Sequence, residues 1–600
     1  MKPLMTVVLL AAALILGWLL LPVPESNGPA VSQTRHTASA PPASDFTLRV
    51  ERVFTGSDWL SPGLVEVREG RISRVGNDFE PAADLPLLDL ADRTLLPGLI
   101  DAHVHAFGSA LVDALNFGVT TVLDQANDSA LIATLRQSGP GAQLFASGPP
   151  ATAPGGHGTQ YGYTPPPVTG PLDAAGFART IQEAGSDWMK IIIERGMGNW
   201  RMPSLDRDTV EALVVAAEQV GLKPVAHVSE LETAHWAMAA GAHGLVHVFA
   251  DQPVDDALLE LMAANRRFIV PTLVVMESVA GMVSEDVASD DRIGPWLSPE
   301  QRGSLGQRWP GPRNPVLRQR VIENIRAMHA AGIAILAGSD APNPGTAHGL
   351  SLHRELELLV EAGLSSSEAL AAATSLPALH FGLDDRGLLA PGRCADLLVL
   401  NGDPRADIST TLDIHAIWQA GQPVERVQAA TVASAQVPAH GRLSDFRPDA
   451  AGAEFGLGWE PTEDQMAGGG SVVEMQSGGD ESLAWIRLSG EIRSGFGWPW
   501  AGAMFTPGSE PMMPVDLSSF SRLRFSARGR PPELRVMVFS PALGAMPATQ
   551  VVRIGEDWES FELPLAGFAG ADPAAISGLV FVAGPGLGEF EFDLAEVRLD

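Results

Sequence analysis

Histidines and one aspartate stand at the ends of apolar segments in this sequence, where they could bind a metal ion. His103 and His105 close LLPGLIDAHVH, and residues two apart on a strand point to the same side. His227 closes LKPVAHV, His247 lies near the end of HGLVHVFAD, and Asp340 ends IAILAGSD. Imidazole and carboxylate groups suit Zn²⁺ and related divalent ions. The HxH pair alone fits two hydrogen-bonding histidines equally well, so the prediction depends on whether the fold brings all five side chains together.

The amino-acid composition excludes some kinds of metal site and binding partner. The chain has 600 residues and a single cysteine, Cys394, which excludes an intrachain disulfide and a CxxC metal site. Asp and Glu number 71 and Lys and Arg 40, for a net charge of −31, which argues against a nucleic-acid partner. Hydrophobic residues at 45% and charged residues at 18% are typical of a globular protein with a large core.

Eight apolar segments alternate with amphipathic ones between residues 96 and 382. This alternation predicts an α/β fold, a (β/α)₈ TIM barrel, in which loops at the carboxyl ends of the strands build the active site. The histidines and Asp340 then stand at the ends of strands one, five, six and eight, where the barrel converges. The expected strands are LLPGLIDAHVH, VTTVLDQ, AQLFASG, DWMKIIIERG, LKPVAHV, HGLVHVFAD, FIVPTLVV and IAILAGSD.

Segments of β character surround the barrel. Residues 46–95 and 383–427 predict one small composite β unit, a split β-sandwich, built from both sides of the barrel. Residues 445–600 contain short strands separated by Gly/Pro turns, which predicts an all-β, jelly-roll-like sandwich. Within the barrel, residues 149–172 and 276–315 are expected to be long loops.

The amino-terminal segment predicts membrane targeting. An apolar stretch runs from Leu4 to Leu21 after Lys2, so residues 1–22 fit either an uncleaved membrane anchor or a cleaved signal peptide. Residues 23–45 are rich in Pro, Ser, Ala and Thr and predict a flexible linker. We therefore expect the rest of the chain to be extracytoplasmic, membrane-anchored or secreted to the periplasm.

Lys190 lies in the apolar fourth strand, DWMKIII, where a bare ammonium group is costly unless it is paired. It could form a salt bridge with Asp340 or Glu194, or CO₂ could convert it to a carbamate. With this lysine, the sequence resembles the amidohydrolase superfamily, in the branch of imidazolonepropionase and Xaa-Pro dipeptidase-like prolidases. The resemblance spans roughly residues 46–427 and includes LLPGLIDAHVH, the two single histidines, GSDAP and the tail SSSEALAAATSLPALHFGL.

The resemblance implies a role for each residue of the cluster. His103, His105 and Asp340 match the ligands of a more buried metal. His227 and His247 match those of a second metal, and Lys190 matches a carbamate that bridges the two ions. Two divalent ions, with zinc the first choice, would activate a bridging hydroxide, and Asp340 would be the catalytic proton acceptor.

The resemblance implies substrate contacts less directly. His157 stands in the Gly-His-Gly context of the loop after strand three, and Tyr161 follows in the same loop. Arg195, after strand four, could pair with a substrate carboxylate. His348, before the last helix of the barrel, could face the substrate or support a ligand. For Arg195 and Tyr161, a solvated or packing role is an equal alternative.

These features predict a hydrolase that cleaves a C–N amide bond without a covalent intermediate, in a small dipeptide or N-acyl amino acid. One alternative is ring opening of a cyclic amide or lactone. Another is a non-catalytic carbohydrate-binding or scaffold protein with a degenerate barrel. The resemblance also suggests a homo-oligomer. The terminal sandwich is similar to the galactose-binding-like, complex I intermediate-associated type, in which Trp498 and Trp500 could contact carbohydrate or pack in a core.

Overall fold

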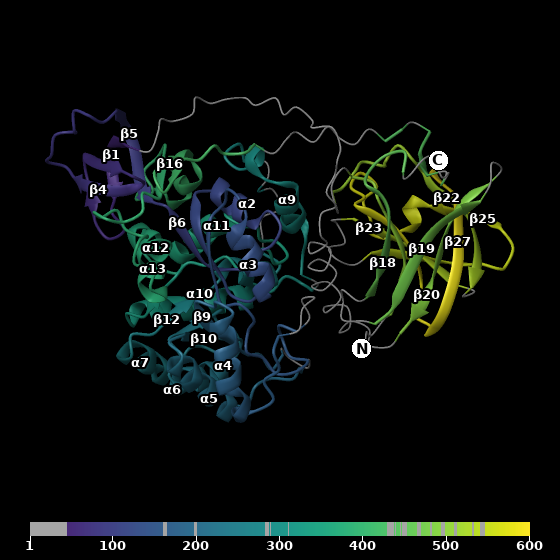
Figure 1. Cartoon of the computed structure of the whole chain (residues 1–600), viewed down its shortest axis with the longest axis horizontal. Helices are drawn as coiled ribbons and strands as arrows, with labels where there is room; N and C mark the ends of the chain where they lie inside the picture. The colour runs from purple at the N-terminus through teal and green to yellow at the C-terminus, as the bar shows by residue number, and fades with distance from the viewer. Residues whose placement is uncertain are drawn as a thin grey trace.

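Figure 1 shows the computed structural model of the chain. The structure describes residues 45–159, 165–196, 201–282, 287, 290–309, 311–428, 437–438, 440–444, 446, 453–464, 470–479, 483–493, 499–508, 513–530, 533–540 and 547–600. The predicted membrane segment and most of the linker lie outside these residues. Within the described part of the chain, no helix has the length and apolar character needed to cross a membrane.

A small sheet joins two distant parts of the chain. Its strand order is β16-β15-β14-β5-β1-β3-β4, and β2 pairs with β1. Because β14 pairs with β5, residues near position 400 complete a sheet that begins at Phe46. Phe46, Val65 and Trp418 are buried in its core. The strands are β1 (Phe46–Phe54), β2 (Trp59–Leu60), β3 (Gly63–Arg68), β4 (Arg71–Gly76), β5 (Leu87–Pro97), β14 (Leu397–Leu400), β15 (Ile414–Gln419) and β16 (Gln422–Pro423).

Parallel strands form the centre of the next region. Three of them make one sheet, β6-β7-β8, and five make another, β13-β12-β11-β10-β9. Two isolated parallel bridges join segments at the margins of these sheets, Ala151 to Ile191 and Val104 to Ala341. The strands are β6 (Leu99–Val104), β7 (Val119–Asp124), β8 (Gln143–Ala146), β9 (Trp188–Ile193), β10 (Lys223–Val228), β11 (Gly244–Val246), β12 (Phe268–Val270) and β13 (Ala334–Ile335).

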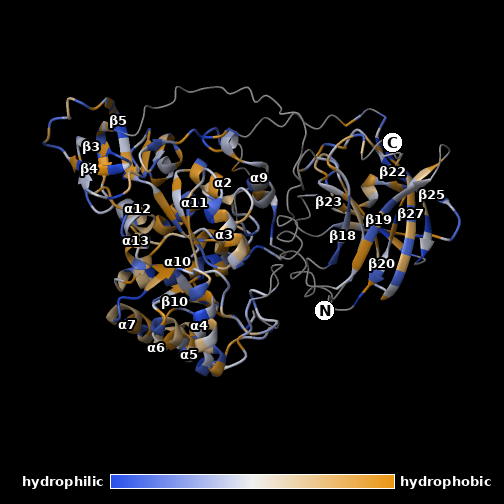
Figure 2. Cartoon of the chain, viewed as in Figure 1, coloured by the Kyte–Doolittle hydropathy of each residue, from blue (hydrophilic) through white to orange (hydrophobic). Residues whose placement is uncertain are grey.

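A helix follows each of these strands along the chain, so the predicted α/β character of this region is confirmed. Aspartates at several N-caps accept backbone N–H groups, as Asp128, Asp206 and Asp255 do. Figure 2 shows orange, apolar ribbon within this region and more blue at its edges. The helices are α2 (Ala110–Asn116), α3 (Ser129–Gln137), α4 (Ala174–Glu183), α5 (Arg207–Gln219), α6 (Leu231–Ala240), α7 (Asp256–Ala264), α10 (Pro315–Ala330) and α11 (Leu350–Glu361), and α12 (Ser366–Ala372) and α13 (Ser375–Phe381) come after them.

The seventh strand differs from the sequence prediction. FIVPTLVV was expected to be one strand, but β12 ends at Val270 and TLVV leads into helix α8 (Leu273–Val279). Pro271 has no N–H to donate, and Thr272 has a left-handed φ of 51°, so the chain turns there. The expected long loop also contains helix α9 (Pro299–Gly306), which a Ser298–Gln301 capping box starts.

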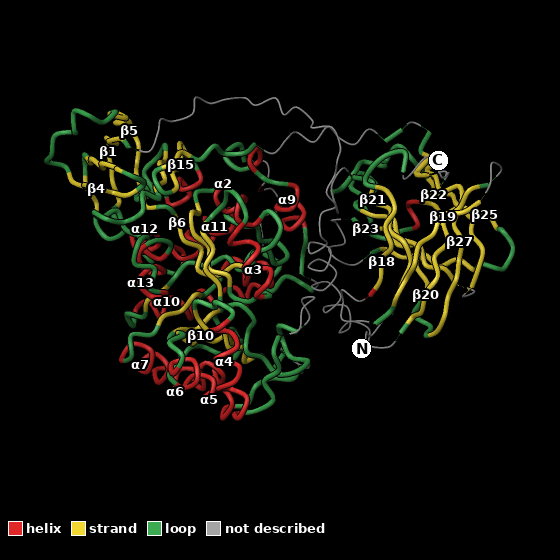
Figure 3. Tube along the Cα trace, in the orientation of Figure 1, coloured by secondary structure: helices red, strands yellow, loops and turns green. Residues whose placement is uncertain are grey.

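The carboxyl-terminal region is rich in β-structure, as expected. Two antiparallel sheets have the orders β19-β20-β27-β22-β25, with β17 beside β27, and β18-β21-β26-β23-β24 (Figure 3). Leu488, Phe505, Phe525, Phe581 and Phe592 are buried in their common core. The strands are β17 (Arg442–Ser444), β18 (Gly458–Glu463), β19 (Val472–Gly479), β20 (Ala484–Ile492), β21 (Ala501–Thr506), β22 (Arg522–Arg530), β23 (Glu533–Phe539), β24 (Ala548–Arg553), β25 (Glu559–Pro564), β26 (Gly578–Ala583) and β27 (Gly588–Leu599).

Of the two tryptophans predicted as carbohydrate contacts or core residues, Trp498 lies outside the described residues. Trp500 is buried beside Met504, Met537 and Val580. This environment is that of a packing residue, and carbohydrate binding at the sandwich stays a prediction.

Candidate metal centre

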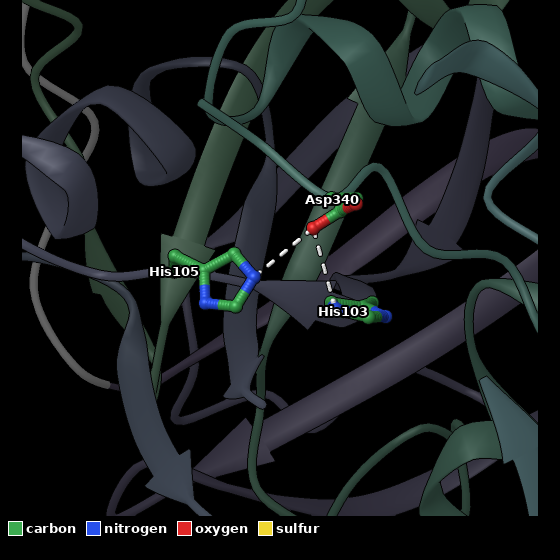
Figure 4. Close-up of side chains that lie close together, drawn as sticks. All are labelled: His103, His105 and Asp340. Carbon is green, nitrogen blue, oxygen red and sulfur yellow. Dashed lines mark ion pairs between the residues drawn. The ribbon is translucent and has the colours of Figure 1, made fainter. Parts of the chain in front are cut away.

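His103, His105 and Asp340 meet at the carboxyl ends of β6 and β13. Asp340 Oδ1 lies 3.3 Å from His103 Nε2 and 3.1 Å from His105 Nε2, as the dashed lines in Figure 4 mark. Backbone hydrogen bonds hold the two segments together, because the Asp340 N–H donates to the His103 carbonyl and the His105 N–H to the Ala341 carbonyl. The three residues can offer ligand atoms that all lie within 4.8 Å of one another.

The hydrogen bonding of these residues fits a divalent cation. Both ring nitrogens of His103 and Oδ1 of Asp340 are buried and have no hydrogen-bond partner among the described residues. Orphaned polar atoms of this kind are costly, and a bound cation would satisfy them. His105 Nδ1 lies 3.2 Å from the Ala126 carbonyl, to which it donates, so in the neutral ring the lone pair is on Nε2, the nitrogen that faces Asp340. Burial also lowers the pKa of His103 well below its ordinary value, so this imidazole is neutral and able to bind metal.

His227 and His247 lie next to this group. His227 is in β10, and His247 directly follows β11. The ring centroid of His247 lies 4.6 Å from that of His103 and 4.5 Å from that of His227. His247 Nδ1 lies 2.8 Å from the hydroxyl oxygen of Thr272, and 3.7 Å from Asp340 Oδ2. The structure therefore brings together all four histidines and the aspartate that the sequence singled out.

Lys190 is in β9 and is 2% exposed. Ile192, two residues further along β9, is in register with His227 on β10, so Lys190 and His227 share one face of the sheet. Burial lowers the pKa of Lys190 to about 7, and the nearby acidic groups Asp340 and Asp124 oppose that shift. The lysine is therefore beside the predicted ligands and is easily deprotonated.

Of the predicted substrate contacts, His157 lies inside the cluster. Its ring centroid is 4.9 Å from that of His227. Burial lowers the pKa of His157 to about 3, so the ring is neutral at physiological pH. Tyr161 lies outside the described residues.

Arg195 lies next to acidic side chains. Its Nε donates to Glu230 and its Nη2 to Glu232, each over 2.6 Å, and its guanidinium group lies over the Trp236 ring. A substrate carboxylate would have to compete with Glu230 and Glu232 for this arginine, so binding of substrate by Arg195 stays a prediction.

His348 is buried and contacts the backbone of His105, one of the three residues of the candidate metal group (His103, His105 and Asp340). Its Nε2 lies 3.1 Å from the His105 carbonyl and donates to it. Helix α9 in turn holds this segment, since Gln301 donates to the His348 carbonyl over 2.6 Å. Of the two roles predicted for His348, this contact is the one expected of a residue that supports a ligand.

Sequence reasoning missed several residues that hold the cluster. The Asp101 carboxylate is fully buried and accepts the backbone N–H groups of His103 and Ser339 and the Ser339 hydroxyl. Asp124, at the end of β7, accepts the N–H of Ala106 over 2.6 Å. The positions of both gave a signal, because Asp101 is in the LIDAHVH segment and Asp124 ends a predicted strand.

The backbone is strained at this centre. His247, Thr272 and Asp340 have positive φ angles of 70°, 51° and 53°, which residues other than glycine rarely adopt. Such conformations persist where the surrounding structure enforces them, and they gather at functional sites. The three angles therefore identify the same location as the side chains do.

Comparison with known proteins agrees with the site and the fold. Residues 94–424, more than half of the chain, match the amidohydrolase family, and the chain belongs to this family. It is similar to an imidazolonepropionase of Deinococcus deserti, with 41% identity over 103 residues, 16% of this chain and 26% of that protein. It is also similar to an imidazolonepropionase of Cereibacter sphaeroides, with 25% identity over 411 residues, 62% of this chain and 98% of that protein.

The fold is similar to that of a solved Xaa-Pro dipeptidase with methionine bound in its active site. The TM-score is 0.53 and the identity 22%, over 64% of this chain and all of that one. The first of the two imidazolonepropionases is matched over only about a quarter of its length. Family, fold and candidate metal group together support a metal-dependent hydrolase that acts on C–N bonds.

Proposed function

We propose that the protein hydrolyses a C–N bond of a small molecule with the help of two divalent cations. The observation that carries the proposal is the group of His103, His105 and Asp340, which has unsatisfied buried ligand atoms and lies against His247. Family membership supports it independently. Zinc is the first candidate, because imidazole and carboxylate are among its usual ligands.

The site residues would have separate roles in binding the two cations, in proton transfer and in orienting the substrate. His103, His105 and Asp340 would hold one cation, and His227 and His247 the other. Cations bound there supply Lewis acidity and lower the pKa of bound water. The Asp340 carboxylate lies between His103, His105 and His247 and can accept a proton from the attacking water and return it to the leaving nitrogen. His157, beside His227, is suited to orient the substrate.

We infer that Lys190 carries a carbamate. The neutral amine attacks CO₂, a new N–C bond forms, and one proton leaves to solvent. The lowered pKa of Lys190 supports this step, since the neutral amine is the reactive form. The carbamate would give the buried position an anionic group with two oxygens between the two cation sites, in place of an ammonium group. We also infer that the two parallel sheets close into one eight-stranded barrel, which the bridges Ala151–Ile191 and Val104–Ala341 support.

The favoured substrate is a small dipeptide or N-acyl amino acid. Similarity in fold to an Xaa-Pro dipeptidase is compatible with it. A cyclic amide or lactone is the second candidate, because the donors of Arg195 are already engaged by Glu230 and Glu232 and a substrate without a carboxylate would not need them. We further propose that the enzyme acts outside the cytoplasm, since residues 1–22 have the composition of a membrane-targeting segment.

The test is turnover by the purified, metal-loaded chain. The panel contains Xaa-Pro dipeptides, N-acyl amino acids, hydantoin-like rings and lactones. We expect at least one class with a C–N bond to be hydrolysed, and Asp340→Asn to abolish that turnover while the protein remains folded. Equal turnover by wild type and Asp340→Asn would contradict the proposal, as would a metal-loaded protein that turns over lactones only.

A further inference from the structure

Glu194 is a buried carboxylate beside His227, one of the two predicted histidine ligands of the second cation. It directly follows β9, and its side chain is 10% exposed. Glu194 stands four positions after Lys190 in the chain, and its carboxylate lies near His227. The acidic groups that act on Lys190 are Asp340 and Asp124, which leaves the alternative of a Lys190–Glu194 salt bridge without support.

The contacts of Glu194 point to His227 instead. Its Oε2 lies 3.4 Å from His227 Nε2, and its Oε1 accepts the N–H of Gly196 over 2.5 Å. The ring centroid of His227 lies 4.9 Å from that of His157 and 4.5 Å from that of His247. The carboxylate is thus held in place on one side by the backbone and faces the imidazole on the other.

We propose that Glu194 is a positioning residue that orients His227 and completes the second cation site, an inference that rests on the proposed function. A neutral imidazole has one N–H and one lone pair. When Nε2–H donates to Glu194, the lone pair is on Nδ1, and the ring presents that nitrogen as a ligand. A carboxylate that accepts from a ligating histidine fixes its tautomer and orientation and makes it a stronger donor to the metal.

Charge also favours this role. In the first group the carboxylate of Asp340 is itself a predicted ligand, whereas His227 and His247 contribute imidazoles alone and share the proposed Lys190 carbamate with the first site. Glu194 places a negative charge beside the second pair, where it lowers the free energy of a bound dication. Its removal should therefore weaken the second cation site and leave the first unchanged.

The experiment measures Co²⁺ binding to the metal-stripped full-length chain in bicarbonate-containing buffer, by competition with a chelating dye. Loss of a partner of a metal-ligating histidine typically costs about 10- to 100-fold in metal affinity. We expect Glu194→Ala to weaken one of two equivalents by this amount and to change the other less than about threefold. Glu194→Gln keeps an oxygen acceptor but not the charge, and charge-assisted hydrogen bonds are roughly twice as strong as neutral ones. We therefore expect Glu194→Gln to weaken the same equivalent by about tenfold, at the lower end of the range for Glu194→Ala.

A matched control is Glu218→Gln. Glu218 also faces a histidine, since its Oε1 lies 3.5 Å from His243 Nε2, but both residues are outside the cluster. This variant should bind both equivalents like wild type. If Glu194 served only to hold the backbone at Gly196, Glu194→Gln would keep that hydrogen bond. It would then not weaken the binding of one cation more than that of the other.

The outcomes separate the two proposals. Wild type that binds fewer than two equivalents contradicts the proposed function itself. If wild type binds two equivalents and Glu194→Gln binds both with unchanged affinity, only the role of Glu194 is overturned. Because Glu194→Gln is near-isosteric with the wild type, it tests the role of Glu194 even if Glu194→Ala does not fold.

Discussion

The buried Asp101 carboxylate offers a quantitative test of how the first metal group is built. It accepts from the Ser339 N–H at 2.9 Å, the Ser339 hydroxyl at 2.6 Å and the His103 N–H at 3.1 Å, and it is fully buried. Asp101→Ala would leave three buried donors without an acceptor. Each unsatisfied donor costs about 1–3 kcal/mol, and because water can enter the space that is left, we expect a total of about 3–6 kcal/mol.

Hydrogen exchange measured by mass spectrometry resolves this effect, since peptides that cover β6 and β13 report separately from those of the sandwich. A tenfold change in an equilibrium constant corresponds to about 1.4 kcal/mol, so Asp101→Ala should lower protection in these peptides by about 10²- to 10⁴-fold. Asp101→Asn keeps an acceptor for the two N–H groups and should lose far less, about 1–2 kcal/mol. Protection in Asp101→Ala within twofold of that in Asp101→Asn would refute the reasoning.

Three further predictions concern the surroundings of the site. Glu355 is fully buried and accepts the Val274 N–H, and burial raises its pKa from 4.5 to about 8. Its stabilising contribution is therefore full below about pH 4.5 and is lost as the pH rises through about 8. Urea unfolding should show a lower free energy of unfolding at pH 9 than at pH 5, and Glu355→Gln should make this difference smaller by roughly 3–5 kcal/mol. Thr272→Val removes the hydroxyl that contacts His247 Nδ1, and in dye competition it should bind Co²⁺ about tenfold or more weakly, whereas Thr272→Ser should bind like wild type. Removal of the cations with a chelator should lower the unfolding temperature measured by calorimetry, because a cation at about 1,000 times its Kd stabilises the folded state by about 4 kcal/mol. An unchanged unfolding temperature would contradict metal binding by the folded protein.

The sequence predicts at which strand ends the candidate metal ligands lie, and which kinds of side chain they are. The residues that end the first, fifth, sixth and eighth apolar segments meet in the structure, because parallel strands that alternate with helices present their carboxyl ends at one edge. Lys190 stood out for a physical reason as well, since a lysine among isoleucines needs a partner or a modification.

Other features have no local signal in the sequence. The Asp101–Ser339 contact joins residues 238 positions apart, and no periodicity reports such a pair. The interaction of Thr272 with His247 depends on a left-handed φ at a residue that rarely adopts one. In the seventh segment, the apolar composition of TLVV suited a strand and a buried helix equally, and Pro271 decided between them.

The most direct test of the account is the number of divalent ions bound to each chain. We predict close to two equivalents by elemental analysis of the full-length protein prepared with zinc and bicarbonate. Lys190→Ala should reduce this number, because it removes the proposed bridging carbamate while His103, His105 and Asp340 remain. Two equivalents in both proteins would contradict the role of Lys190, and a wild-type protein that takes up no metal would contradict the account as a whole.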